Sequence, residues 1–395
     1  MTARRIAVVT TSRAGYGCLR HLLRAVEEDP SLVLQLVATG MHLAREHGHT
    51  VDEIEADGFA IARRVPMLLA DDDEASIAKS VGIGLLAFAD AWRELAPDVV
   101  VCLGDRFELF APVIAAFLQR IPIAHIHGGE TSEGALDEGV RHSVTKMAAI
   151  HFPATQSYAR RIAQMGELPE RIFACGAPAL DALHAEPLLE RDALAERVGL
   201  PLTRPTALVT YHPVTLELEQ TDDQVAALLS ALERSGLDAV ITRANADAGG
   251  GRVNAALEAF CERNPKRFRL HAHLGQQAYF SCLRHLDVMI GNSSSGLVEA
   301  PSFALPVVNI GNRQRGRVRA HNVIDVACDP AAILAAIERA QSTAFRTSLR
   351  DLRNPYDLHG DGRTSHRIKE HLRSIALGGD LLIKPFHDLP GTDLQ

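Results

Sequence analysis

One stretch of the chain, AHIHGGETSEGALDEGVRHSVTKMAAIHF at residues 124–152, gathers many groups that can carry or move a proton. It begins as an apolar strand with two histidines and two carboxylates, and it continues with two more carboxylates and an Arg-His pair. General acid–base catalysis uses Asp, Glu and His side chains whose pKa values are tuned by burial and by neighbouring charges. The stretch therefore indicates proton transfer at a site close to the end of a strand.

Two further strand ends in the first half carry polar groups. In LGDRFELF (103–110), Asp105 and Arg106 follow an apolar run, and Asp105 could equally cap a helix by accepting from its first N–H groups. In TTSRAGYGCL (10–19), Arg13 offers a planar fork for a phosphate. A glycine turn with a solvated arginine explains that segment as well, because it is not a G-x-G-x-x-G motif.

The stretch GNSSSGLVEAPSFALPVVNIGNRQRGR (291–317) suits a diphosphate. Its serines and glycines open a helix after an apolar strand, where backbone N–H groups can hold an anion. Glu299 could accept from ribose hydroxyls, and Arg313, Arg315 and Arg317 could cover the phosphates. A serine-rich helix cap beside a solvated basic loop is the plainer interpretation.

Two other strand ends of the second half carry polar side chains. His212 in VTYHPVT (209–215) could face a phosphate or a leaving oxygen, or it could be a hydrogen-bonded structural residue. Asn245 and Asp247 in RANADAGGG (243–251) could bind a ligand or only shape a turn.

The elements that must position these groups alternate between short β-branched runs and longer amphipathic stretches. This rhythm predicts an α/β protein with two Rossmann-like, doubly wound domains and a ligand site in the cleft between them. We expect domains at residues 1–185 and 186–370, followed by a C-terminal helix and tail at 371–395. The predicted parallel strands lie at 5–11, 32–40, 97–105, 121–129, 206–214, 237–245, 267–274, 286–296 and 305–311.

Composition limits the partners. The 395 residues carry 49 acidic and 41 basic side chains, a net charge of −8, and no long basic run, so a nucleic-acid surface is not expected. The N-terminal apolar run is too short for a signal peptide or a membrane span, so we expect a cytoplasmic protein without a membrane partner. No C-x-x-C spacing indicates a zinc site or disulfide framework among Cys18, Cys102, Cys175, Cys261, Cys282 and Cys328.

Taken together, the motifs resemble the UDP-N-acetylglucosamine 2-epimerase family, and specifically its hydrolysing branch. The G-T-R-P-E start and the H-x-E-A-G stretch of the non-hydrolysing branch are not present in this sequence. The resemblance spans residues 6 to 326 and rests on S-R-A-x-Y, GDRFE, HIHGGETSEGALDEGVRHSVTK, HPVT, NADAG, GNSSSGLVEAPSFALPVVNIGNRQRGR and NVIDV.

The resemblance implies a fold similar to glycosyltransferase B enzymes, and conversion of UDP-GlcNAc and water to ManNAc and UDP through a glycal-like intermediate. It implies no metal and no nicotinamide cofactor, a nucleotide-sugar partner, and a homodimer or homotetramer. The expected acid–base residues are Asp105, Glu130, Asp137 and Glu138, with His127 and His142 delivering protons or orienting an acid. The positions expected to bind the nucleotide sugar are Arg13, Arg106, Asp181, His212, Asn245, Ser293, Ser294, Glu299 and Arg313.

Three departures from the family pattern bear on the substrate. Gly15 stands where many relatives have an acid, which could open space for a different sugar. His127 stands where some relatives carry a glutamate, and Arg243-Ala244 replace an aromatic residue and a proline, which would place a further cation near the nucleotide.

Three other functions stay open. The same chemistry could act on a UDP- or GDP-linked 2,4-diacetamido-trideoxy sugar of a legionaminic-acid route. The fold could instead serve a glycosyltransferase, which would need a surface for an acceptor. It could also serve a non-catalytic sensor of a nucleotide sugar, which would bind the ligand without turnover.

Overall fold

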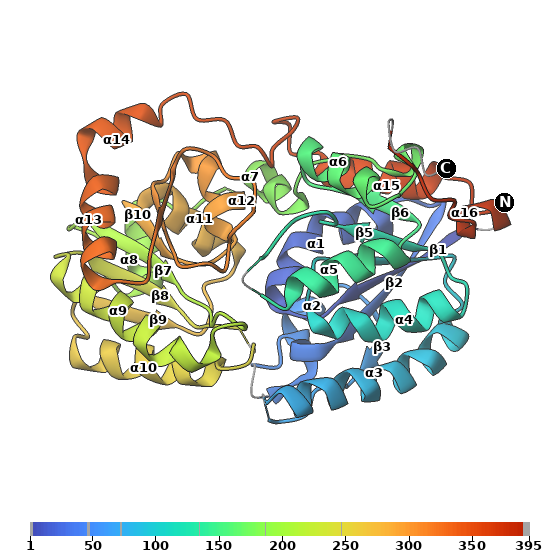
Figure 1. The fold of residues 1–395 in the computed structure, drawn as a ribbon, viewed down its shortest axis with the longest axis horizontal. Coiled ribbons are helices and arrows are strands. Elements are labelled where there is room, and N and C mark those ends of the chain that lie inside the picture. The colour runs from blue at the N-terminus through green and yellow to red at the C-terminus, as the bar shows by residue number, and fades with distance from the viewer. Residues whose placement is uncertain are drawn as a thin grey trace. The chain divides into compact units, whose positions relative to one another are not determined.

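A computed structural model describes residues 3–45, 48–71, 73–133, 135–185, 187–245 and 247–389. The chain folds into two units, each built on a six-stranded parallel sheet (Figure 1). Unit 1 comprises residues 1–130, 137–182 and 358–395, and unit 2 comprises residues 131–136 and 183–357.

The sheet of unit 1 has the strand order β3-β2-β1-β4-β5-β6. Its strands are β1 (Arg4–Thr10), β2 (Leu32–Thr39), β3 (Ile61–Val65), β4 (Val99–Leu103), β5 (Ile123–Ile126) and β6 (Ile150–Phe152). Its helices are α1 (Arg13–Glu27), α2 (Val51–Ala56), α3 (Glu74–Leu95), α4 (Phe110–Leu118), α5 (Asp137–Met147), α6 (Gln156–Gln164), α15 (Thr364–Ser374) and α16 (Gly379–Leu382).

Helices cover both faces of this sheet, which is why its strands are apolar on both sides. On β1, Ile6 and Val8 pack with α1, α2 and α15, whereas Ala7 and Val9 pack with α3, α4 and α5. Helix α3 is long and apolar enough by length and composition to cross a membrane. Its buried residue Trp92 nevertheless belongs to the second of these two cores and donates to the Pro112 carbonyl of α4.

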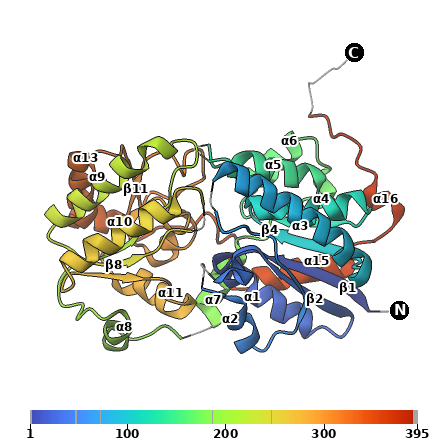
Figure 2. The same cartoon turned by 90° about the horizontal axis from the view of Figure 1, so that it is seen from below.

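Unit 2 repeats the architecture with the order β12-β11-β10-β7-β8-β9. Its strands are β7 (Thr206–Thr210), β8 (Asp238–Thr242), β9 (Phe268–His271), β10 (Val288–Gly291), β11 (Val307–Ile310) and β12 (Val323–Val326). Its helices are α8 (Arg191–Val198), α9 (Thr221–Arg234), α10 (Gly250–Arg263), α11 (Gln276–His285), α12 (Ser295–Val298), α13 (Pro330–Gln341) and α14 (Thr343–Ser348), and α7 (Ala182–Ala185) lies at the junction of the units. Figure 2 shows α10 and α11 on opposite sides of β8.

Both sheets therefore have the order of a doubly wound Rossmann fold, in which the first strand of the unit lies beside the fourth. The predicted fold class is confirmed. Ligands of such sheets bind beyond the carboxyl ends of the strands, where the order reverses. That point lies between β1 and β4 in unit 1 and between β7 and β10 in unit 2.

The domain boundaries differ from the predicted ones in two places. The chain returns to unit 1 at Leu358, so the predicted end of the second domain at residue 370 falls inside α15. The return has a physical cause, because Ile368 and Leu372 of α15 are buried in the same core as α1. In addition, Thr131–Leu136 packs with unit 2, although the residues on both sides of it belong to unit 1.

Candidate active site

The acid–base candidates of unit 1 gather after β5. His127 has a left-handed backbone (φ 65°), and its Nδ1 lies 2.5 Å from Glu130 Oε1. Glu130 is almost completely buried, at 1% exposure. A buried carboxylate bonded to an imidazole can take and return a proton without competition from bulk water. The predicted residues His127 and Glu130 therefore form one buried hydrogen-bonded pair, and its part in proton transfer stays a prediction.

Arg141 of α5 connects this pair to Asp105. Its Nη1 donates to the His127 carbonyl (3.2 Å) and lies 3.6 Å from Glu130 Oε2, and its Nη2 donates to the Asp105 carboxylate at the end of β4. The guanidinium is 1% exposed. Arg141 was not among the predicted site residues. Its sequence signal was only its place in the Arg-His pair at residues 141–142, because its partners Asp105 and Glu130 lie outside its helix.

His125, on β5, holds the segment that carries His127 and Glu130 through two hydrogen bonds. It is completely buried, its Nε2 donates to the Gly104 carbonyl (2.8 Å), and its Nδ1 lies 3.1 Å from the Thr145 hydroxyl. A Cβ on Gly128 would approach both His125 Nδ1 and Thr145 Oγ1 to 3.0 Å, so a larger residue there would require these side chains to shift. Burial lowers the pKa of His125 to about 3, which keeps the ring neutral and its hydrogen bonds fixed.

This burial predicts a loss of stability in mild acid. The unfolded chain protonates His125 near pH 6.5, whereas the folded chain does so only near pH 3, so folding is disfavoured progressively as the pH falls through this window. Between pH 7 and pH 5, the group should cost about 2 kcal/mol of unfolding free energy. Urea unfolding of wild type and His125→Asn at both pH values should show the smaller decrease in the variant. His359→Gln, at an exposed histidine, should retain the wild-type decrease, and equal decreases in all three would contradict the assignment.

The remaining acid–base candidates lie on α5. Asp137 and Glu138 occupy its first turn, where the helix dipole stabilises a carboxylate. Glu138 Oε1 lies 3.1 Å from His142 Nε2, one turn further on, and these side chains are 28% and 29% exposed. The structure thus pairs two predicted residues at the surface of α5, in contrast to the buried pair of His127 and Glu130.

Two predicted anion-binding arginines of unit 1 face carboxylates. Arg106 makes a fork with Glu108, with Nη2–Oε1 at 3.0 Å and Nε–Oε2 at 3.1 Å, and Glu108 is completely buried. Arg13 Nε lies 2.7 Å from Glu53 Oε2 of α2. That either arginine also binds the ligand stays a prediction.

Asp181 binds the start of a helix, and its predicted contact with the nucleotide sugar stays a prediction. Its two carboxylate oxygens accept from the backbone N–H groups of Thr364 (2.9 Å) and Ser365 (2.6 Å). These are first N–H groups of α15, which no other helical residue can satisfy. We therefore assign Asp181 to the fold, where it fixes the returning C-terminal segment to unit 1.

In unit 2, His212 follows β7 and is held by two asparagines. Its backbone N–H donates to Asn292 Oδ1 and its carbonyl accepts from Asn292 Nδ2, both at 2.7 Å. Its Nδ1 accepts from the backbone N–H of Asn245 (3.2 Å), so the neutral ring carries its proton on Nε2. An Nε2–H group of fixed direction suits a phosphate or leaving oxygen. Asn292 lies beside the predicted serines but was not itself predicted.

Asn292 also fixes the basic loop after β11. Its carbonyl accepts from Arg313 Nη1 (3.3 Å) and from Gln314 Nε2 (2.8 Å). Arg313 Nη2 lies 3.8 Å from the Asp247 carboxylate. Gly291, at the end of β10, has φ 138°, and a Cβ there would lie 1.9 Å from the Thr210 carbonyl oxygen. His212 and Arg313, which follow different strands of this sheet, are therefore both hydrogen-bonded to Asn292, close to the point where the strand order reverses.

The serine-rich segment forms a shorter helix than expected. Ser293 and Ser294 precede α12, which has only four residues before a 3-10 turn begins at Ala300. So short a helix adds little dipole, and backbone N–H and hydroxyl groups are the useful donors there. Burial is the main cause that raises the pKa of Tyr279 above its usual value, and the charge of Glu299, which follows α12, raises it further.

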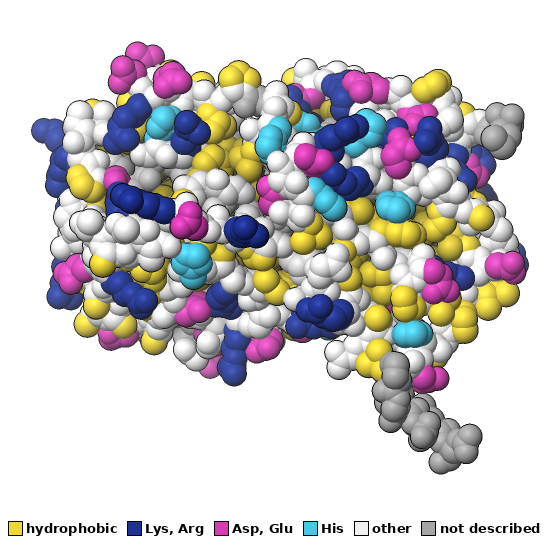
Figure 3. Space-filling view, turned by 90° about the horizontal axis from the view of Figure 1, so that it is seen from above, with side chains coloured by type: hydrophobic (Ala, Val, Ile, Leu, Met, Phe, Trp, Pro, Cys, Tyr) yellow, Lys and Arg dark blue, Asp and Glu magenta, His cyan; other side chains and the backbone are white. Residues whose placement is uncertain are grey.

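Arg243, which was expected to place a further cation near the nucleotide, forms an ion pair with a glutamate of α10. Its Nη2 lies 3.0 Å from Glu258 Oε1 of α10, at the surface. Arg315 and Arg317 bind the segment at residues 131–133, and their expected contact with the phosphates stays a prediction. Over the face shown in Figure 3, basic and acidic side chains are interspersed.

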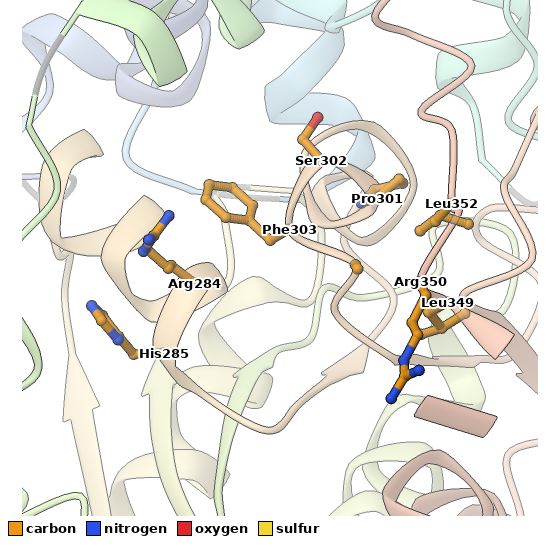
Figure 4. A pocket seen from close by; sticks show the side chains of 9 residues that line it. Arg284, His285, Pro301, Ser302, Phe303, Leu349, Arg350 and Leu352 are labelled. Atoms are coloured by element: carbon orange, nitrogen blue, oxygen red, sulfur yellow. The ribbon is translucent and has the colours of Figure 1, made fainter. Parts of the chain in front are cut away.

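A groove of about 630 Å³ lies on unit 2, away from the predicted residues (Figure 4). It is lined by Arg284, His285, Pro301, Ser302, Phe303, Ala304, Leu349, Arg350 and Leu352. None of the predicted site residues lines this groove. Within the described ranges, no three His, Cys, Asp or Glu side chains gather so that they could hold a metal ion.

Comparisons with known proteins identify the family of the chain. The family model for UDP-N-acetylglucosamine 2-epimerase matches residues 24–373. The chain is 38% identical to a GDP/UDP-N,N'-diacetylbacillosamine 2-epimerase (hydrolyzing) of Campylobacter jejuni, over 88% of this chain and 90% of the relative. It is also 38% identical to a UDP-N,N'-diacetylbacillosamine 2-epimerase (hydrolyzing) of Legionella pneumophila, over 96% and 98%. A UDP-N-acetylglucosamine 2-epimerase of Neisseria meningitidis is 30% identical over 86% and 88%.

Among solved structures, that of a UDP-N-acetylglucosamine 2-epimerase from Listeria monocytogenes matches with a TM-score of 0.79 and 19% identity, covering 95% of this chain and 97% of the other. At that identity the match supports the two-unit fold. The family model covers most of the chain, and the sequence relatives match it nearly from end to end. The chain therefore belongs to the UDP-N-acetylglucosamine 2-epimerase family, and its nearly full-length likeness to hydrolysing relatives places it in the hydrolysing branch.

Proposed function

We propose that the protein is a hydrolysing 2-epimerase of a UDP- or GDP-linked 2,4-diacetamido-trideoxy sugar. It would release the nucleoside diphosphate and the free sugar with inverted configuration at C2. The observation that carries the proposal is the buried network of Glu130, His127, Arg141 and Asp105, since inversion at C2 requires several acid–base groups around one sugar ring.

The reaction divides into an elimination and an addition. In the first step a base takes the C2 proton, its electron pair forms the C1–C2 double bond, and the bond from C1 to the diphosphate oxygen breaks. In the second step water adds its oxygen to C1 and loses a proton, while an acid protonates C2 on the opposite face. Inversion at C2 therefore needs a base on one face of the sugar ring, which removes the proton, and an acid on the other face, which returns one. We assign these transfers to the set of Asp105, Glu130 and Asp137, with His127 orienting Glu130.

The departing diphosphate requires positive or dipolar groups, because charge develops on the leaving oxygen. We assign this task to the Nε2–H group of His212 and to the guanidinium of Arg313, which Asn292 holds in fixed directions. The backbone N–H and hydroxyl groups of Ser293 and Ser294, which follow β10, add neutral donors.

Two observations support the diacetamido substrate. Relatives named for diacetylbacillosamine are 38% identical, whereas the Neisseria meningitidis relative named for UDP-N-acetylglucosamine is 30% identical. Within the described residues, a Cβ at Gly15 would meet only Ser12 Oγ, at 3.5 Å, so a side chain would fit there. The absence of an acid at this position therefore leaves space, and we assign that space to the substituent that distinguishes the two sugars.

UDP-GlcNAc remains the second candidate substrate. It is supported by the family to which the chain belongs and by the 30% identity to the Neisseria meningitidis relative over 86% of this chain.

A substrate panel tests the proposal. Release of UDP or GDP should be followed with UDP- and GDP-linked 2,4-diacetamido-trideoxy-glucose and with UDP-GlcNAc under identical conditions. We expect kcat/KM for one diacetamido substrate to exceed that for UDP-GlcNAc by at least about 100-fold, which corresponds to about 3 kcal/mol. Higher kcat/KM for UDP-GlcNAc would replace the proposed substrate by the second candidate. A Gly15→Glu variant should lower kcat/KM for the diacetamido sugar more than for UDP-GlcNAc.

A further inference from the structure

The segment between two acid–base candidates is held by unit 2. Glu130 and Asp137 flank residues 131–136, which pack with unit 2. Arg317 Nε donates to the Thr131 carbonyl (2.9 Å), and its Nη2 lies 3.3 Å from Ser132 Oγ. At the other end of the segment, the Leu136 N–H donates to Thr215 Oγ1 (3.1 Å).

A glycine lets the basic loop come this close. Gly316 has φ 81°, and a Cβ there would lie 2.5 Å from Glu133 Oε1 and 2.7 Å from Thr131 Oγ1. The Glu133 N–H donates to the Arg315 carbonyl (3.3 Å) between these contacts. The backbones of the two segments are therefore bonded directly, and the left-handed backbone at residue 316 favours a glycine there.

The same two loops carry the nucleotide candidates. Thr215 follows His212 by three residues, and Arg317 follows Arg313 by four. A ligand that orders either loop therefore also orders the end of segment 131–136 that is bonded to that loop. Glu130 and Asp137 are the residues directly before and after this segment, so their positions depend on it. Catalytic geometry must be held to within a fraction of an ångström, so this attachment affects turnover directly.

We infer that Arg317 is a positioning residue, which couples nucleotide binding in unit 2 to the placement of Glu130 and Asp137. The inference deepens the proposed function and rests on it for the reaction that is positioned. Arg317 suits this role because its planar fork bonds both a carbonyl and a hydroxyl of the segment, which a lysine could not do in one geometry. Arg315, in contrast, is 71% exposed, and its side chain makes a surface ion pair with Glu133.

The test compares Arg317→Met and Arg317→Lys with the matched control Arg315→Met. UDP affinity is measured by calorimetry, turnover is measured on the preferred substrate of the panel, and amide hydrogen exchange is followed with and without UDP. We expect Arg317→Met to lower kcat about 10- to 100-fold while the Kd of UDP changes less than about threefold. UDP should protect the amides of Glu133 and Leu136 in wild type and in Arg315→Met but not in Arg317→Met. Arg317→Lys should lie between wild type and Arg317→Met in kcat.

Other outcomes overturn the inference. A weaker UDP affinity with unchanged kcat would make Arg317 a ligand of the diphosphate. Equal decreases of kcat in Arg315→Met and Arg317→Met would show that the two bonds from Arg317 to Thr131 and Ser132 have no specific effect on turnover. Wild type that binds UDP but turns over no sugar of the panel would refute the proposed function, and the exchange experiment would still decide whether UDP orders the segment. Thermal unfolding of Arg317→Lys shows whether the fold is kept.

Discussion

Replacing Glu130 by Gln should lower kcat by about 10³-fold and leave the Kd of UDP nearly unchanged. The substitution keeps the volume of a side chain that is 1% exposed, but it removes the charge and the proton-accepting oxygen that lies 2.5 Å from His127 Nδ1. Single-turnover kinetics with the preferred substrate and calorimetry with UDP separate the two effects. The nucleotide candidates lie in unit 2, which explains why binding should persist.

The matched control is Glu133→Gln, three residues further along the same loop. Glu133 is 48% exposed and pairs with Arg315 at the surface, so its variant should retain turnover within about threefold. Wild-type turnover in Glu130→Gln would remove Glu130 from the acid–base set. A loss of UDP binding in that variant would indicate instead that the carboxylate supports the fold.

Arg313→Ala should weaken UDP binding about 30- to 100-fold, which is the loss of one or two charge-assisted hydrogen bonds. Arg313 is held by the Asn292 carbonyl and lies 3.8 Å from Asp247, so its guanidinium is directed before the ligand arrives. Calorimetric titration with UDP measures the change. Arg313→Lys, which keeps the charge but not the fork, should lose less affinity.

Arg243→Ala is the control for charge alone. Arg243 also follows a strand of the same sheet, but it pairs with Glu258 on α10, so its removal should leave the Kd of UDP within about twofold. An unaltered Kd in Arg313→Ala would show that the phosphate assignment is wrong. A comparable loss in Arg243→Ala would mean that general electrostatic attraction, rather than a built site, holds the nucleotide.

The interior strands could be predicted from the sequence, and three edge strands could not. β1, β4, β7 and β10 are buried on both faces and therefore read as continuous apolar runs. β3, β6 and β12 lie at sheet edges and were not predicted. β3 has the sequence IARRV and is largely exposed, and β6 has only three residues. Short or polar segments become strands only because a neighbour offers its hydrogen bonds, which is tertiary information.

The site could be predicted where chemistry and strand ends coincide. His127, Glu130 and Asp105 follow strands, and the structure joins them through Arg141. Arg141 itself lies inside a helix, where a lone arginine normally indicates a solvated surface. Its complete burial depends on the packing of α5 against β5, which the sequence alone does not contain.

For two of the candidate residues, the structure shows partners that are distant in the chain. Asp181 looked like a ligand group, but its partners lie 183 and 184 residues further on, at the start of α15. Arg317 looked like a phosphate ligand, but it bonds Thr131, 186 residues earlier. Local patterns identify a polar group at a strand end, whereas only the folded chain shows which partner it meets.

Hydrolytic inversion at C2 leaves a label that proton NMR can follow. Proton NMR of the purified protein with its preferred nucleotide sugar in deuterium oxide follows the free nucleoside diphosphate, the configuration of the released sugar and deuterium at its C2. We expect free nucleoside diphosphate and a sugar of inverted configuration that carries deuterium at C2. Release of a sugar with retained configuration and its original C2 proton would contradict this expectation, because the protein would then be a simple hydrolase.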